Sequence, residues 1–136
     1  IVRTSNSLNE LWVDGGHNVD ASKVLKASME SMNPLDLHII YGSLKNKDYR
    51  SFLLNFKELS VTLWAIKIKN QPTSLSADII IKEAEEIGYI KPRKINELIE
   101  GINKICDISN SCKKPIRILI CGSLYLAGEV LKENKK

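Results

Sequence analysis

A polar turn near the amino end of the chain carries residues suited to binding an anionic ligand. It reads Asp14-Gly15-Gly16-His17-Asn18 and follows a short apolar run. Paired glycines let a backbone turn tightly and approach a ligand closely, and a helix starting beyond them would offer free N–H groups to phosphate or carboxylate. Asp14 is suited to accept hydrogen bonds from a ribose diol, and His17 and Asn18 to donate to anionic oxygens. The simpler interpretation is a strand-to-helix connection closed by an Asx cap.

A second turn with similar properties lies near the other end of the chain. Gly122-Ser123-Leu124-Tyr125 also follows an apolar run and precedes an amphipathic segment. Ser123 is placed to cap the following helix and to offer its hydroxyl to a ligand. A plain helix cap is an equally good interpretation of Ser123, and Tyr125 is of a type more often packed than bound to a ligand.

Both turns lie within a regular alternation of apolar runs and amphipathic segments. The runs are rich in β-branched residues without strict alternation, which is typical of strands covered on both faces. The segments between them place apolar residues at helical spacing. The predicted strands are Leu11–Val13, Leu37–Tyr41, Val61–Ile66 and Ile116–Cys121, and the predicted helices are Asp20–Met32, Asp48–Leu59, Ser76–Ile87, Ile95–Ile105 and Leu124–Glu133.

Two local expectations concern the ends of these elements. The first helix is expected to begin with Asp20 as its cap and to place Val24 and Leu25 on its buried face. A weak edge strand is expected at Tyr89–Lys91, ended by Pro92, because proline has no N–H to donate to a neighbouring strand.

The alternation predicts an α/β fold, a Rossmann-like three-layer domain with helices on both faces of a mainly parallel sheet of about five to six strands. Ile1–Arg3 and Asn9–Val13 flank a polar turn, so one antiparallel strand is expected at the amino-terminal edge. Ligands of such sheets bind at the carboxyl ends of the strands. This rule selects four loops and sets the first beside the last on one rim: Asp14–Asn18, Gly42–Lys47, Lys67–Leu75 and Gly122–Tyr125.

Length and composition indicate a single globular domain. The chain has 136 residues, of which 43% are hydrophobic and 26% charged, with a net charge of +4. No apolar run approaches the roughly 18 residues of a membrane-spanning helix, and aromatics at 6% are too scarce for a base-stacking surface. Three Cys without a C-x-x-C spacing and two His favour reduced thiols over a disulfide framework or metal site. We expect a cytoplasmic protein without membrane or specific nucleic-acid partners.

Taken together, the motifs resemble one family. ELWVDGGHN, LHIIYGSLKNKD and ILICGSLYLAGEVL are similar to the carboxyl-terminal domain of folylpolyglutamate synthase, also called dihydrofolate synthase, in the Mur ligase superfamily. The resemblance covers residues 1–136. It implies an enzyme that uses ATP and Mg²⁺ to join L-glutamate to a folate or dihydropteroate carboxylate through an acyl phosphate. It also implies a partner, the amino-terminal P-loop domain of the same enzyme, which carries the magnesium ligands and most of the folate pocket.

The resemblance implies roles for individual residues. Asp14 matches the family's Asp that holds the ATP ribose, and Asn18 belongs to the same ATP-binding motif. His17 matches the His expected near the γ-phosphate and the incoming glutamate, which makes it the candidate catalytic residue. Ser123 matches a Ser expected to help bind glutamate. Many relatives have Pro after the His-Asn pair, where this chain has Val19.

Three further residues are weaker candidates for the site. Lys47 and Asp48 match a Lys-Asp pair of the family, and Tyr125 belongs to the serine motif. The simpler interpretations are a solvated loop charge for Lys47 and a helix cap for Asp48.

The chain lacks the motif that usually holds a triphosphate. No G-x-x-x-x-G-K-[ST] occurs in it, and its first residue is Ile rather than Met. We therefore expect a fragment that is inactive alone and supplies one wall of the ATP and glutamate cleft. The alternative is a stand-alone, non-catalytic α/β module that binds a small anion or a nucleotide.

Overall fold

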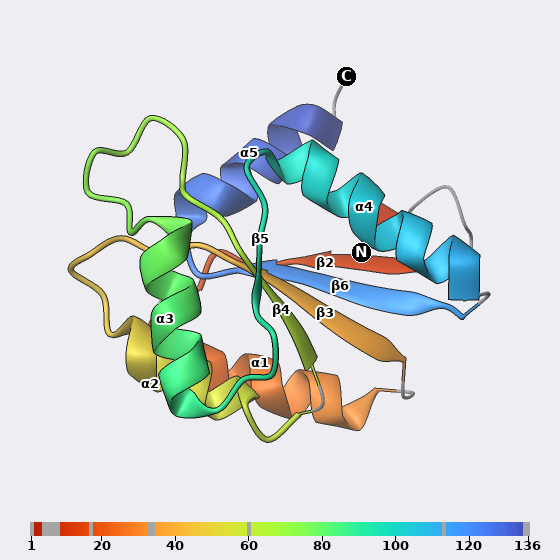
Figure 1. Ribbon diagram of the computed structural model, residues 1–136, viewed down its shortest axis with the longest axis horizontal. Helices are drawn as coiled ribbons and strands as arrows, with labels where there is room; N and C mark the ends of the chain where they lie inside the picture. Colours follow the sequence, from red (N-terminus) through yellow and green to blue (C-terminus); the bar gives the residue numbers. More distant parts are fainter. Residues whose placement is uncertain are drawn as a thin grey trace.

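The computed structural model describes residues 2–3, 9–16, 18–32, 35–59, 61–112 and 114–134, with the backbone alone at 2, 3, 112, 133 and 134. These residues form a three-layer α/β fold (Figure 1). Their sheet has six strands in the order β1-β2-β6-β3-β4-β5. Every neighbouring pair is parallel except β1 with β2, which is antiparallel. The predicted fold class is confirmed, including the antiparallel strand at the amino-terminal edge.

No helix in the described part of the chain is long and apolar enough to cross a bilayer.

The elements follow the predicted alternation closely. The strands are β1 Val2–Arg3, β2 Glu10–Val13, β3 Asp36–Tyr41, β4 Val61–Ala65, β5 Arg93–Lys94 and β6 Ile116–Cys121, and the helices are α1 Val19–Ser31, α2 Tyr49–Phe56, α3 Ala77–Ile87, α4 Leu98–Cys112 and α5 Leu124–Asn134.

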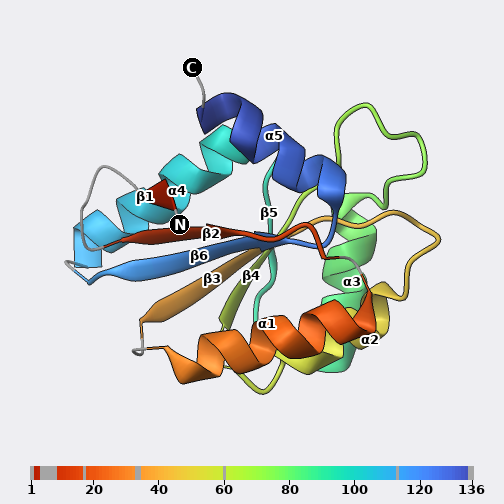
Figure 2. The same ribbon diagram turned by 180° about the vertical axis from the view of Figure 1, so that it is seen from behind.

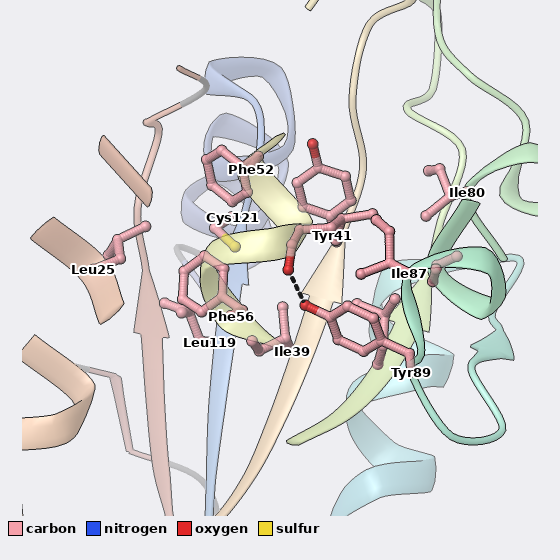
Figure 3. Packing of buried hydrophobic residues seen from close by; sticks show 14 of the residues in the cluster. Leu25, Ile39, Tyr41, Phe52, Phe56, Ile80, Ile87, Tyr89, Leu119 and Cys121 are labelled. Carbon is pink, nitrogen blue, oxygen red and sulfur yellow. Dashed lines mark hydrogen bonds between the residues drawn. The ribbon is translucent and has the colours of Figure 1, made fainter. Parts of the chain in front are cut away.

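Helices α1, α2 and α3 cover one face of the sheet, and α4 and α5 cover the other (Figures 1 and 2). The core under the first three helices is aromatic: the ring of Phe52 lies 5.2 Å from that of Tyr41 and 5.5 Å from that of Phe56. Figure 3 shows this packing and the buried hydroxyl of Tyr89, which donates to the Leu53 carbonyl at 2.5 Å. That bond satisfies the polar tip of a side chain that is otherwise apolar core.

The core under α4 and α5 is mainly aliphatic, with Trp64 as its largest side chain. The Trp64 indole Nε1 donates to His38 Nδ1 at 3.0 Å, and the Arg93 guanidinium lies 5.3 Å from the Trp64 ring centre. Burial lowers the pKa of His38. His38 is thus an interior histidine whose Nδ1 is satisfied.

The cap of the first helix lies two residues earlier than expected. The cap is Asn18, whose side chain accepts from the Ala21 N–H at 2.8 Å, whereas Asp20 lies inside the first turn. The expectation for Leu25 is correct, but Val24 is 67% exposed. An Asn can cap as well as an Asp, so residue type alone did not locate the start of the helix.

The expected edge strand at Tyr89–Lys91 is wrong. The edge strand is β5, which pairs with β4 after Pro92. Tyr89 is turned into the core and Lys91 has a left-handed backbone, with φ of 49°. A left-handed backbone does not suit a strand, and Pro92, which was expected to end the strand, precedes β5 instead.

Candidate ligand-binding rim

The two polar turns lie side by side at the carboxyl edge of the sheet. Val13 and Ile120 are parallel partners in β2 and β6, and the Asp14 N–H extends the pairing by donating to the Ile120 carbonyl at 2.9 Å. Leu124 packs directly on Gly15, where an added Cβ would lie 2.5 Å from the Leu124 Cδ2. The predicted juxtaposition of the first and last loops is therefore present in the fold.

The Asp14 turn is a compact loop closed by its own carboxylate. Asp14 Oδ1 accepts from the Gly16 N–H at 2.6 Å. A Cβ at Gly16 would lie 2.6 Å from the Ala21 Cβ, so a larger residue would push α1 away. Asp14 is partly exposed, and no described residue donates to its second carboxylate oxygen, Oδ2. Asp14 can therefore still accept a hydrogen bond from a ligand hydroxyl.

Of the other two polar residues of this turn, the structure describes only Asn18. His17, the candidate catalytic residue, lies outside the described residues. Asn18 is exposed and uses its side-chain oxygen to cap α1. Asn18 is thus the cap of α1, and its side-chain NH₂ has no acceptor among the described residues.

Ser123 immediately precedes α5 and lines a pocket. Its Oγ accepts from the Tyr125 N–H and its carbonyl from the Ala127 N–H, both at 3.1 Å. Because the hydroxyl only accepts here, its proton is available to donate to a ligand oxygen. The pocket measures about 220 Å³ and is lined by Leu44, Lys47, Gly122, Ser123, Leu124 and Tyr125.

Gly122 brings β6 and β3 together beneath this pocket. Its φ is +106°, and a Cβ there would lie 2.3 Å from the Gly42 carbonyl oxygen and 2.7 Å from the Tyr41 ring. Only glycine combines that left-handed backbone with so close an approach. The glycine at 122 therefore allows the loop after β6 to approach the backbone that follows β3.

The weaker candidates separate into a structural and an accessible group. Asp48 accepts from the Ser51 N–H at 3.2 Å and caps α2, which was its simpler interpretation. Lys47 is half-buried in the pocket wall, and Tyr125 is 54% exposed at the pocket mouth. Lys47 and Tyr125 therefore lie beside Ser123, whereas the Asp48 carboxylate is engaged in the helix cap.

A support for the rim was missed by sequence reasoning. The loop after β4 pairs with the loop after β3: the Lys45 N–H donates to the Thr73 carbonyl at 2.8 Å and the Leu75 N–H to the Ser43 carbonyl at 2.9 Å. Leu44 and Ser74 form an antiparallel bridge between them. The signal available in the sequence was two serines, at 43 and 74, beside apolar residues, and this is too common a pattern to predict a pairing.

Neither buried ionisable group beneath the rim is poised for chemistry near neutral pH. Burial raises the pKa of the Cys121 thiol, and the negative charge of Asp14 raises it further. Burial also raises the pKa of the Tyr41 hydroxyl. No group of three or more His, Cys, Asp or Glu gathers within the described ranges, so those residues offer no ready ligand set for Mg²⁺.

The fold is that of an α/β domain of Rossmann-like type. No protein-family model matches the sequence, and no curated protein matches it. Solved structures do match. Folylpolyglutamate synthase of Mycobacterium tuberculosis, complexed with ADP and AMPPCP, has a TM-score of 0.82 at 17% identity, over 93% of this chain and 30% of that one.

Two further solved structures agree. The bifunctional folylpolyglutamate synthase/dihydrofolate synthase of Yersinia pestis, with AMPPNP and Mn, has a TM-score of 0.76 at 17% identity, over 93% of this chain and 28% of that one. Escherichia coli FolC with ADP has a TM-score of 0.71 at 17% identity, over 90% of this chain and 28% of that one. The chain therefore has the fold of one part of these enzymes and spans 28–30% of their length.

Proposed function

We propose that this chain is the carboxyl-terminal domain of an ATP-dependent ligase of the folylpolyglutamate synthase type, which adds L-glutamate to folate or dihydropteroate. The proposal depends on one observation: the turns at Asp14 and Ser123 lie on neighbouring strands and both open to the same rim. The likeness to solved ligases that bind ADP supports it. A cytoplasmic location is part of the same proposal.

The rim residues have chemistry that suits this reaction. The Asp14 carboxylate is an acceptor for a ribose hydroxyl, and Asn18 can donate through its side-chain NH₂. The Ser123 hydroxyl can donate to a carboxylate of glutamate, with the Lys47 ammonium from the same pocket balancing its charge. We assign to His17 contact with the reacting phosphate. Holding reactants in place and balancing charge is the main part of catalysis in such a transfer.

A second domain must complete the site in this proposal. The chain has no P-loop motif, and the described residues offer no magnesium ligand set. ATP and Mg²⁺ would be held mainly by an amino-terminal P-loop domain, with this chain closing the other wall. The chain alone is then expected to catalyse no ligation.

The test mixes the chain with the P-loop domain of a folylpolyglutamate synthase and measures product that depends on both ATP and glutamate. Ser123→Ala should lower kcat/KM by about tenfold or more, because it removes a hydrogen bond to a charged group. It should cost about 1 kcal/mol or less in unfolding free energy, since only one helix-cap bond is lost. His17→Ala should impair turnover in the same way.

Ser109→Ala is the matched control, because Ser109 is also a buried serine but lies at the opposite edge of the sheet. It should lower stability by about 1–2 kcal/mol and leave turnover of the folded protein unchanged. If Ser123→Ala behaves like Ser109→Ala, the serine is structural. ATP binding by the chain with no turnover in the mixture would favour the non-catalytic binding module instead.

A further inference from the structure

A buried serine in the loop between β4 and α3 holds that loop closed. Ser74 is only 4% exposed. Its Oγ accepts from the Ile68 N–H at 2.9 Å and donates to the Leu75 carbonyl at 3.0 Å. Its own N–H donates to the Gln71 carbonyl at 3.0 Å. This stretch contains no helix or strand, so the bonds of Ser74 take the place of regular pairing.

Ile68 is the first contact that leads from Ser74 toward the Ser123 pocket. Ile68 is 1% exposed, so its N–H needs an acceptor within the protein, and the Ser74 Oγ is that acceptor. The Ile68 side chain packs on Gly42, where an added Cβ would lie 3.2 Å from the Ile68 Cγ1. The Gly42 carbonyl in turn lies against Gly122, which immediately precedes Ser123. The serine hydroxyl thus anchors the residue that supports this backbone contact.

The pairing of the loops after β3 and β4 is the second contact. Both loops project from the same end of the sheet (Figures 1 and 2). Ser74 lies at the centre of their pairing, opposite Leu44 in the antiparallel bridge, and Leu44 lines the Ser123 pocket. Ser74 is therefore linked to two sides of the pocket, through Leu44 on one and through Ile68 and Gly42 on the other.

The hydroxyl of Ser74 reaches farther along the chain than that of the neighbouring buried serine. Ser43 is also fully buried, but its Oγ donates to the carbonyl of the next residue, Leu44, at 3.1 Å. The Ser74 Oγ bonds to an N–H six residues away. Replacing Ser74 by an apolar residue would leave a buried N–H without its acceptor, which is costlier than losing a bond at the surface.

We propose that Ser74 is a positioning residue for the Ser123 pocket: its hydroxyl holds Ile68 against Gly42 and the loop after β4 against Leu44, and so sets the separation of the pocket walls. The inference rests on the proposed function, in which this pocket takes a carboxylate of L-glutamate. Ser74 touches no reacting group in this scheme. It lowers the cost of binding, because walls that are already fixed lose little entropy when the ligand enters.

The first test measures amide hydrogen exchange by NMR on the 136-residue chain alone. Ser74→Ala should quicken exchange at Ile68 by about tenfold or more, because the variant removes the acceptor of that N–H. Exchange at Lys45 and Leu75, the donors of the loop pairing, should quicken with it. Ser74→Thr keeps the hydroxyl and should exchange at these two amides like the unmodified chain.

Ser109→Ala is the matched control, since Ser109 is a buried serine with two hydrogen bonds at the opposite edge of the sheet. It should leave exchange at Lys45 and Leu75 unchanged. Unchanged exchange at these amides in Ser74→Ala would overturn the inference. Equal quickening in Ser74→Ala and Ser109→Ala would also overturn it, because the effect would then be a general loss of stability.

The second test uses the ligation mixture with the P-loop domain. Ser74→Ala should raise the KM for glutamate about fivefold and change kcat by less than about twofold, because only the ordering of the pocket is affected. Ser74→Thr should restore most of the KM, and Ser109→Ala should leave both constants unchanged. An unchanged KM, or a fall in kcat as large as the rise in KM, contradicts a positioning role.

The two tests separate this inference from the proposed function. The exchange measurement needs neither a substrate nor the P-loop domain. Absence of ligation with the unmodified chain would therefore count against the proposed function alone. Normal ligation by Ser74→Ala with an unchanged KM would count against the role of Ser74 and leave the ligase proposal standing.

Discussion

Both edges of the sheet carry polar residues but use them differently. At the carboxyl edge, Lys47 and Ser123 line a pocket and Asp14 is partly exposed, and each keeps part of its hydrogen-bonding capacity free of described partners. At the amino edge, polar groups face one another inside the protein. The Asn9 side-chain oxygen accepts from Ser109 Oγ at 3.1 Å and from the Ile116 N–H at 3.0 Å.

An ion pair at the amino edge is likewise formed between two side chains of the protein itself. Glu10 Oε1 accepts from Trp12 Nε1 and from Arg117 Nε, each at 2.9 Å. The Arg117 side chain is only 5% exposed, and that of Glu10 is 23% exposed. A buried polar group that has its partner within the chain stabilises the fold, and an accessible one with spare capacity is available to a ligand. Accessibility, rather than residue type, distinguishes the rim from the scaffold, since the side-chain NH₂ of Asn9 also has no hydrogen-bond partner among the described residues but is buried.

The largest effect is expected from breaking the amino-edge ion pair. Glu10→Leu should lower the free energy of unfolding by about 3 kcal/mol, because it leaves the Arg117 charge buried without its counter-ion. Urea denaturation measures this loss. The double variant Glu10→Leu/Arg117→Met should recover most of it. Ligand binding per folded molecule should be unchanged in both, and a loss of binding in the folded double variant would contradict the division between the edges.

The next largest loss of stability is expected from a substitution at the carboxyl edge, at Gly122. Gly122→Ala forces a side chain into a left-handed backbone against the Gly42 carbonyl and should cost about 2–3 kcal/mol. Gly128→Ala, on exposed α5 with nothing within 4 Å of the added Cβ, should instead stabilise by about 0.5–1 kcal/mol through helix propensity. Thermal unfolding compares the two. Equal effects would mean that the approach of β6 to β3 does not constrain the rim.

The smallest effect is a pH dependence from His38, in the amino half of β3. Burial lowers its pKa; the charge of Asp36 opposes this and that of Arg93 adds to it. Because the folded state keeps His38 neutral, its contribution to stability is complete above about pH 6.5, the ordinary pKa of His, and is lost as pH falls from there through the folded pKa. Urea midpoints between pH 7.5 and 5 should therefore decline more in the unmodified chain than in His38→Gln, which keeps an acceptor for Trp64. Parallel curves would show that His38 contributes nothing.

The sequence predicted the elements well and their local ends less well. Apolar runs located β3, β4 and β6 because a strand buried on both faces needs continuous apolar residues. The strand order was not predicted. The rule that ligands bind at the carboxyl ends of parallel strands was enough to place the Asp14 and Ser123 turns on one edge of the sheet. The start of α1 and the place of β5 were missed because caps and two-residue edge strands depend on a few local bonds that residue types do not specify.

Site residues were predicted by type, but their accessibility was not. Asp48 and Lys47 are adjacent in the sequence, and only the structure separates a carboxylate engaged in capping α2 from an ammonium beside an open pocket. A hollow of about 540 Å³, lined by residues 67–72 with Asn96 and Glu97, could not be predicted at all, since the loop after β4 that lines it turns at Asn70 through a left-handed backbone.

The pairing of the loops after β3 and β4 has a mechanical consequence. The strap formed by residues 43–45 and 73–75 fastens the loop after β3, whose Leu44 lines the Ser123 pocket, to the loop after β4. The Leu44 wall of that pocket therefore cannot move outward without stretching these two backbone bonds or carrying the loop after β4 along with it.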